Sequence, residues 1–344
     1  MARGHGRASA PLGRASAALD PLSDVLRGVR LTGSCFFRVE ASAPWWAEVP
    51  DVAVIGREIL PRAQHLVSYH VVTEGRCWAG LADGTGLWAE AGDVIVVPHG
   101  DCYALGTAPG KVGRQPVAVA RAFFHALAAR ELPATIVEGG GAGGVGVLCG
   151  FLGCDAVPFN PVLALLPRLL KVSPPPAPAK DPLAPLVAYA LGEVLSPSPG
   201  TDGVLLRISE LLFVEVARRL ASALPPAQAG WLAGLRDPLV ARALGLLHRE
   251  PARGWTLPTL ARATGLSRTV LAARFSAVVG QPPIQYLARC RMQLGARLLA
   301  EGAAKVGAIA LDVGYESEAS FSRAFKKATG VAPAAWRRRQ RSML

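Results

Sequence analysis

The spacing of hydrophobic and polar positions changes along the chain, and the first half has the spacing of a β structure. From Pro21 onward, short apolar segments alternate with glycine, proline and other turn residues, a pattern typical of an antiparallel sandwich or barrel. Pro98 ends one of these segments because proline has no amide hydrogen for a strand ladder. The pattern predicts strands at 33–39, 66–73, 77–81, 87–89, 93–97 and 145–151.

Two amphipathic helices are predicted after the proline-rich segment 171–181. Their apolar positions recur at helical spacings of three and four residues, and residues 196–203 separate the two patterns. The positions are Leu183, Leu186, Val187, Ala190, Leu191 and Val194, then Leu205, Ile208, Leu212 and Val216. Each apolar stripe packs against its own domain or against a partner subunit, and the pattern favours the first alternative.

The last third of the chain contains one helical pattern twice. A shift of 50 positions superposes Leu271 on Phe321 and Phe275 on Phe325, and each copy ends in Gly-x-x-Pro. Each copy predicts a helix, a glycine turn and a second helix with an aromatic core residue, which is the order of a helix-turn-helix unit. We expect the two units at about 256–280 and 305–330.

Local signals place the ends of the helices in this region. Asp237, Thr256 and Ser267 are predicted N-caps, and Gly265 is the predicted left-handed turn residue. A long helix over 284–299 is expected to join the two units rigidly, with an inward-facing stripe of Leu287, Cys290, Leu294 and Leu298.

The outer faces of the two second helices are the candidate DNA-reading surfaces. Arginine can bind guanine with two hydrogen bonds, so Arg268 and Arg323 are the predicted base-reading residues. Lys326, Lys327 and residues 337–339 are predicted to neutralise phosphates. The alternative for any one arginine, Arg268 and Arg323 included, is an ordinary surface charge. The full predicted contact set is Ser267, Arg268, Thr269, Ala272, Glu318, Ala319, Ser322, Arg323, Lys326 and Lys327.

Charge and cysteine content support this interpretation. The formal net charge is +12, and residues 237–344 contain 17 Lys and Arg against 6 Asp and Glu, a concentration that favours a polyanion such as DNA over a merely solvated tail. Six scattered cysteines without a Cys-x-x-Cys pair predict a reduced cytoplasm rather than disulfides or zinc. Residues 1–17 are expected to be disordered, and neither a signal peptide nor a membrane span is predicted.

The C-terminal pattern resembles the AraC/XylS family of bacterial transcription regulators. The resemblance is carried by Gly265-Leu-Ser267, by the spacing of Gly280 and Pro283, and most specifically by the segment from Ser320 to Lys326. It implies two helix-turn-helix subdomains set in adjacent major grooves on one face of the DNA. Ala272 and Ala273 stand where relatives often carry larger polar side chains, so the first unit is expected to read few bases directly.

The N-terminal half is similar to the cupin-type ligand-binding domain of many such regulators. His70 and Glu74 match the first cupin motif, but Tyr103 stands where the second motif would end in a metal-binding histidine. This departure from the cupin pattern argues against a metal centre unless the loops bring His65 and His99 close enough to substitute, and no cofactor is expected. His70, Glu74 and Tyr103 are candidate effector-binding residues, and the alternative for His70 is a buried histidine satisfied within the core.

Together these patterns predict an α+β multidomain protein: a cupin-like antiparallel β-barrel over 18–170, a connector and helical linker over 171–230, and an all-α tandem helix-turn-helix domain over 231–344. We expect a non-enzymatic transcription regulator that binds double-stranded DNA, with RNA polymerase, a small-molecule effector and a homodimer as further expected partners. Two alternatives stay open: a metal-dependent cupin enzyme fused to a DNA-binding domain, and a ligand-independent regulator whose barrel only dimerises.

Overall fold

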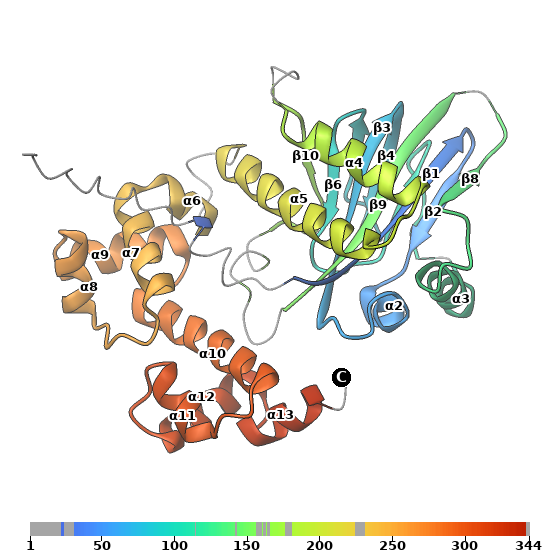
Figure 1. The fold of residues 1–344 in the computed structure, drawn as a ribbon. Helices are drawn as coiled ribbons and strands as arrows, with labels where there is room; N and C mark the ends of the chain where they lie inside the picture. Colours follow the sequence, from blue (N-terminus) through green and yellow to red (C-terminus); the bar gives the residue numbers. More distant parts are fainter. Residues whose placement is uncertain are drawn as a thin grey trace, which may run out of the picture.

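The computed structural model describes residues 22–23, 31–113, 115–141, 143–155, 160, 163, 166–175, 181–223 and 231–341. The expected disordered segment 1–17 lies outside these residues. Figure 1 shows a β-rich half and a helical half, with one long helix, α5, extending from the former towards the latter. In the described part of the chain, no helix is long and apolar enough to cross a membrane.

The β-rich half, here called the β domain, contains two sheets. The six-stranded sheet has the order β10-β6-β3-β9-β1-β8 and the four-stranded sheet the order β2-β7-β4-β5. All pairs are antiparallel except the parallel pair of β1 and β8. The strands are β1 (Leu31–Ser42), β2 (Trp46–Val49), β3 (His65–Glu74), β4 (Arg76–Leu81), β5 (Gly86–Glu90), β6 (Val94–Val97), β7 (Tyr103–Gly106), β8 (Thr135–Glu138), β9 (Gly144–Cys154) and β10 (Leu170–Val172).

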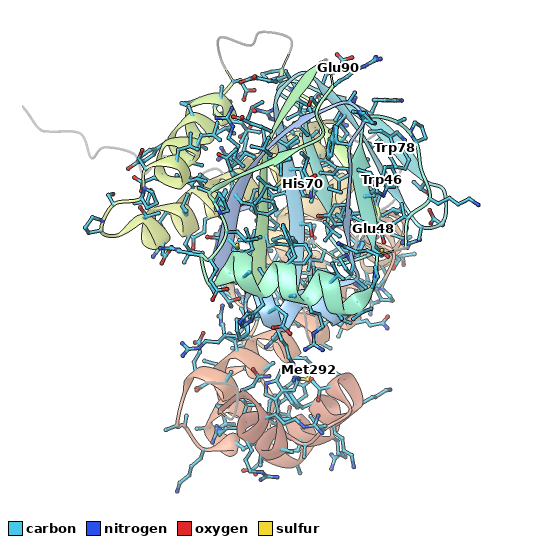
Figure 2. The ribbon with its side chains drawn as sticks, turned by 90° about the vertical axis from the view of Figure 1, so that its right-hand side faces the viewer. Trp46, Glu48, His70, Trp78, Glu90 and Met292 are labelled. Carbon is cyan, nitrogen blue, oxygen red and sulfur yellow. The ribbon has the colours of Figure 1, made fainter. Side chains whose placement is uncertain are left out.

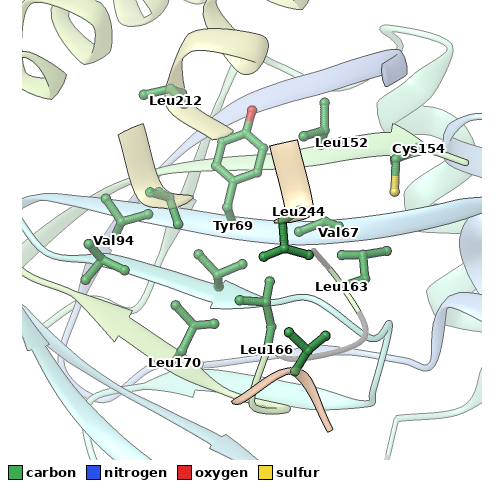
Figure 3. Packing of buried hydrophobic residues seen from close by; sticks show 14 of the residues in the cluster. Val67, Tyr69, Val94, Leu152, Cys154, Leu163, Leu166, Leu170, Leu212 and Leu244 are labelled. Atoms are coloured by element: carbon green, nitrogen blue, oxygen red, sulfur yellow. The ribbon is translucent and has the colours of Figure 1, made fainter. Parts of the chain in front are cut away.

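The six-stranded sheet is buried on both faces. Because successive side chains of a strand point to opposite faces, Leu66 and Val72 of β3 enter the core between the two sheets, with Phe151 of β9. Val67 and Tyr69 instead face the helices α4 (Leu183–Leu195) and α5 (Thr201–Ala223), in the cluster drawn in Figure 3. Two further helices, α2 (Val52–Ile59) and α3 (Val117–Ala128), pack against each other beside the sheets.

The predicted stripes of α4 and α5 pack within the chain. Their buried positions, among them Val187, Val194, Ile208 and Leu212, join the outer-face cluster of the six-stranded sheet. Ser209 of α5 lies within 3.4 Å of the Tyr69 hydroxyl. The intramolecular alternative is therefore confirmed for these positions, and the same cluster of buried side chains continues from α5 into the helical half.

The helical half is built around two cores. The first includes Leu271, Phe275 and Tyr286, and the second includes Phe321 and Phe325. The helices are α6 (Trp231–Arg236), α7 (Pro238–Arg249), α8 (Leu257–Thr264), α9 (Arg268–Val279), α10 (Pro283–Glu301), α11 (Val306–Asp312), α12 (Glu318–Thr329) and α13 (Pro333–Arg341).

The inward face of α10 differs from the predicted stripe. Of the four predicted positions only Leu287 is fully buried, whereas Cys290, Leu294 and Leu298 are half-buried. The reason is that α10 belongs to both cores in turn, so its buried face changes along its length. The buried residues of the helix are Pro283, Tyr286, Leu287, Met292, Gly295, Ala296 and Leu299.

Candidate nucleic-acid interface

The first helix-turn-helix unit consists of α8 and α9, and local caps fix its turn. The Thr256 hydroxyl accepts a hydrogen bond from the Thr259 amide at 3.3 Å, and the Thr259 hydroxyl accepts one from the Thr256 amide at 2.8 Å. Gly265 ends α8 with a φ of 77°, in the left-handed region that glycine adopts without steric cost. Ser267 then begins α9 by accepting a hydrogen bond from the Val270 amide at 3.3 Å. The predicted N-caps and turn residue are confirmed.

The outer face of α9 carries little free charge. Arg274, a second guanidinium on this helix, donates from Nε to Oδ2 of Asp237 at 2.5 Å, and Asp237 also caps α7. Val270, an apolar residue in the first turn, is 47% exposed. Three predicted contact residues are exposed and the fourth is half-buried: Ser267, Arg268, Thr269 and Ala272.

The second unit consists of α11 and α12, with α12 held by an aromatic core. Ser317 caps α12 by accepting a hydrogen bond from the Ser320 amide at 3.2 Å. Phe321 and Phe325 are fully buried, and the Phe325 ring centroid lies 5.8 Å from that of Trp336. The predicted contact residues are exposed, with one half-buried exception, Ser322: Glu318, Ala319, Ser322, Arg323, Lys326 and Lys327.

The two outer faces differ in electrostatics. Arg323, Lys326 and Lys327 lie within five consecutive residues of α12, and none of them forms an ion pair with another described residue. Lys326 and Lys327 lie in the last turn of α12, and positive side chains near the C-terminal end of a helix interact favourably with its dipole. On α9, by contrast, Arg274 is neutralised by Asp237, so Arg268 is the predicted contact residue that carries charge. The outer face of α12 therefore carries three cations without an ion pair and the carboxylate of Glu318, whereas Arg268 is the one such cation among the predicted contact residues of α9.

A rigid frame sets the orientation of the two units. The Arg291 guanidinium of α10 donates to the backbone carbonyls of Pro251 and Arg253, both at 2.8 Å. Gly314, in the turn of the second unit, has a φ of 87°, and a Cβ atom there would lie 2.5 Å from the Ala252 carbonyl oxygen. The loop before α8 thus touches the turn before α12 directly. This contact between the units could not be predicted from the sequence.

Arg337 has a different role from the one predicted. It was grouped with the phosphate-neutralising residues, but its guanidinium donates to the carbonyls of Leu299 at 3.4 Å and Ala304 at 2.5 Å. The last carbonyls of a helix have no partner within the helix, and a nearby arginine satisfies them. Arg337 therefore closes the C-terminal end of α10, whereas Arg338 and Arg339 are exposed.

The structure brings together two of the three effector-binding candidates of the β domain. His70 Nε2 lies 2.6 Å from the Tyr103 hydroxyl, both residues are buried, and burial lowers the pKa of His70 to about 3. Figure 2 shows His70 inside the β domain, away from Trp46 and Trp78 of the four-stranded sheet. Glu74 lies apart at the end of β3, with its side chain 72% exposed. Among the described residues, no group of three or more His, Cys, Asp or Glu side chains is placed to hold a metal ion.

Two capped helix-turn-helix units on one linking helix, with a basic outer face on the second, define a DNA-binding protein. The sequence matches the family model of a cupin over residues 20–222 and that of a helix-turn-helix domain over residues 260–339. It is 33% identical to an AraC-like transcription regulator of Streptomyces lividans, over 93% of this chain and 98% of the relative. The chain therefore belongs to the AraC-like transcription regulators, with a cupin domain before the DNA-binding domain.

Two further similarities were found. The chain is 26% identical to the HTH-type transcriptional regulator AlkR of Acinetobacter baylyi, over 93% of this chain and 99% of the relative. Among solved structures, it is similar to the DNA-binding domain of AdpA, which was crystallised with a target DNA. That match has 28% identity and a TM-score of 0.29, and it covers 30% of this chain and 94% of the other.

Proposed function

We propose that this regulator reads DNA asymmetrically, with the second unit supplying most of the specific contacts. The observation that carries the proposal is the unequal number of cations without an ion pair on the two outer faces: Arg323, Lys326 and Lys327 on α12, beside the carboxylate of Glu318, against Arg268 on α9. Arg323 is the proposed base-reading residue because a guanidinium can bind a guanine edge with two hydrogen bonds. The two lysines are proposed to bind phosphates, which adds affinity without sequence information.

The first unit is proposed to read shape and methyl groups more than polar base edges. Ser267, Arg268, Thr269 and Ala272 present one cation, two hydroxyls and one small apolar side chain. Small apolar side chains contact the thymine methyl group in the major groove. They also let the helix approach the DNA closely, so that binding depends on the sequence-dependent shape of the groove. Glu318, Ala319 and Ser322 complete the proposed contact set on α12.

A DNA mobility-shift titration with the full chain tests the proposal. We expect a specific shift on a fragment from the regulator's own upstream regions, with an affinity that falls steeply as salt rises. Lys326→Ala is expected to weaken binding about equally on specific and unrelated DNA and to reduce the slope against salt by about one. Arg207→Ala is the matched control, because Arg207 is an exposed arginine of α5 paired with Glu210. Absence of any specific, salt-sensitive shift would refute the proposed DNA reading.

We further propose a small-molecule effector that binds the β domain and alters how the DNA-binding units are presented. The continuous cluster of buried side chains from the β domain through α5 into α7 supports this coupling. The expected site at His70, Glu74 and Tyr103 stays a prediction, and a ligand there has to displace packed core side chains. The same proposal includes a division of the chain into domains at residues 170 and 230. It also includes a homodimer, contact with RNA polymerase, a cytoplasmic location and the absence of enzymatic activity.

A further inference from the structure

A cavity of about 420 Å³ lies in the β domain outside the core between the sheets. Its walls come from β1, from the ends of α2 and α3, from residues 130–134 before β8, and from the turn that joins α4 to α5. This volume lies within the range of small-molecule pockets in proteins. Neither His70 nor Tyr103 lines the cavity, so it is separate from the predicted effector site.

One part of the cavity lining, here called the floor, consists of apolar side chains. Phe36 of β1, Leu60 after α2, Leu127 of α3, Leu132 and Leu205 of α5 contribute side chains from five separate segments. A hydrocarbon chain or ring of a ligand would lose its hydration shell against these side chains, and each buried CH₂ group contributes about 0.8 kcal/mol. The floor therefore accepts the apolar part of an amphipathic molecule.

The cavity lining also contains a carboxylate that has no cationic partner in the described part of the chain. Glu193 is half-buried in the last turn of α4, and it forms no ion pair with another described residue. It accepts a hydrogen bond from the Thr201 hydroxyl at 2.5 Å. The C-terminal end of a helix is already the negative end of its dipole, so a carboxylate there opposes helix stability. Glu193 and the end of α4 together create a negative site in the wall of an apolar cavity.

Next to Thr201, the cavity lining also contains an exposed ion pair. Arg130 pairs with Asp202 in the first turn of α5, and the two side chains are 62% and 81% exposed. Exposed pairs of this kind contribute only about 0–1 kcal/mol, so a ligand can displace one partner at little cost. Arg130 is also the one described residue other than glycine with a positive φ, 60°. This φ belongs to the turn that ends α3, in which the Arg130 and Glu131 amides donate to the carbonyls of Leu127 and Ala126.

We propose, on the basis of the effector control proposed above, that this cavity binds a small amphipathic cation. The apolar part lies on Phe36, Leu127 and Leu205, and a protonated amine lies between Glu193 and Asp202. The lining has two carboxylates against one guanidinium, so an ammonium group complements its charge and a carboxylate group does not. The amine replaces Arg130 as the partner of Asp202.

The position of the cavity explains how binding of such a ligand would affect the DNA-binding half. Asp202 and Leu205 lie in the first turns of α5, a helix of 23 residues and therefore about 34 Å long. The other end of α5 contacts α6, next to the first helix-turn-helix unit (Figure 1). Binding at the first turn of α5 therefore acts on the helix that links the two halves.

Isothermal titration of the full chain with octylamine, octanoate and octanol tests the proposal, at concentrations below micelle formation. We expect octylamine to bind more tightly than either of the others. The net charge of +12 attracts octanoate and repels octylamine, so preference for the amine has to come from a local site. Equal binding of the three molecules, or preference for octanoate, would overturn the proposal.

Variants locate the site. Glu193→Gln keeps the shape and an acceptor for Thr201 but removes the charge, and it should weaken octylamine binding about tenfold, as should Asp202→Asn. Glu210→Gln removes a carboxylate of α5 outside the cavity and should leave the affinity unchanged. Octylamine binding that is unaffected by both cavity variants would refute the site. If Glu193→Gln misfolds by circular dichroism, Asp202→Asn and the comparison of the three ligands decide.

The same preparation separates this site from the proposed function. A specific DNA shift without octylamine binding refutes the cavity site and leaves DNA reading intact. Octylamine binding without a specific DNA shift refutes the proposed DNA reading and leaves the cavity site intact. Octylamine that binds and also changes the DNA affinity of the unaltered chain, but not that of Glu193→Gln, supports both.

Discussion

Lowering the pH from 7 to 5 should destabilise the β domain through His70. Burial lowers the pKa of this imidazole to about 3 in the folded protein, against 6.5 for the same group exposed to water. The folded state therefore keeps His70 neutral over a range in which the unfolded chain binds a proton. The stability that His70 contributes is fully present above pH 6.5 and falls as the pH falls towards 3.

The magnitude follows from the pKa difference. One pKa unit corresponds to about 1.4 kcal/mol, and pH 5 lies about 1.5 units below the unfolded pKa. His70 alone should therefore reduce the free energy of unfolding by about 2 kcal/mol between pH 7 and pH 5. Its Nδ1 atom has no hydrogen-bond partner among the described residues, so no contact of that atom favours the protonated form.

Urea unfolding at pH 7 and pH 5, followed by tryptophan fluorescence, measures this loss. His70→Gln removes the titrating group and keeps a polar partner for the Tyr103 hydroxyl, so its loss between the two pH values should be smaller by about 2 kcal/mol. His65→Gln is the matched control, because His65 is half-buried on the same strand. A His70→Gln protein that loses as much stability as the unaltered chain would contradict the reasoning.

Three further predictions concern packing, backbone geometry and thiol reactivity. Phe325→Ala should lower the free energy of unfolding by about 3–5 kcal/mol in urea titrations, whereas Leu311→Ala, at a side chain 63% exposed, should have little effect; equal effects would contradict the second core. Gly265→Ala should cost about 1 kcal/mol in the same assay because its φ is 77°, and a neutral result would contradict the left-handed turn. Burial raises the pKa of the Cys149 thiol well above its usual value, so Ellman's reagent should modify the half-buried Cys102 first; early modification of Cys149 would contradict its burial.

The sequence was sufficient for the long elements of the fold and for their caps. The stripes of α4 and α5, the caps at Asp237, Thr256 and Ser267, and the aromatic core of the second unit depend on local spacing, and local spacing is visible in a sequence. The short strands β2, β7, β8 and β10 have only three or four residues, too few for an alternation to appear, whereas the equally short β6 was recognised as an apolar run that ends at Pro98. The helices α2 and α3 were also missed, and the two sheets and parallel β1–β8 pair depend on long-range contacts.

The candidate sites show the same division. Helical periodicity alone was enough to predict that residues such as Arg323 and Lys326 are exposed on the outer face of one helix. Arg337 could not, because its partners, the carbonyls of Leu299 and Ala304, lie 38 and 33 residues earlier in the chain. The separation of Glu74 from His70 has a similar cause: the two lie on one strand, but Glu74 follows a register shift at the strand end. Glu193 could not be recognised from the sequence as a candidate ligand-binding residue, because that role depends on the cavity that it lines.

Asymmetric DNA reading is tested most directly by comparing Arg268→Ala and Arg323→Ala. The measurement is the ratio of affinities for a specific fragment and an unrelated fragment, by mobility shift at one fixed salt concentration. Arg323→Ala should reduce this ratio by about 10- to 100-fold, the equivalent of about 1–3 kcal/mol of base discrimination, and Arg268→Ala should reduce it much less. A ratio that falls as far or further with Arg268→Ala would contradict the account.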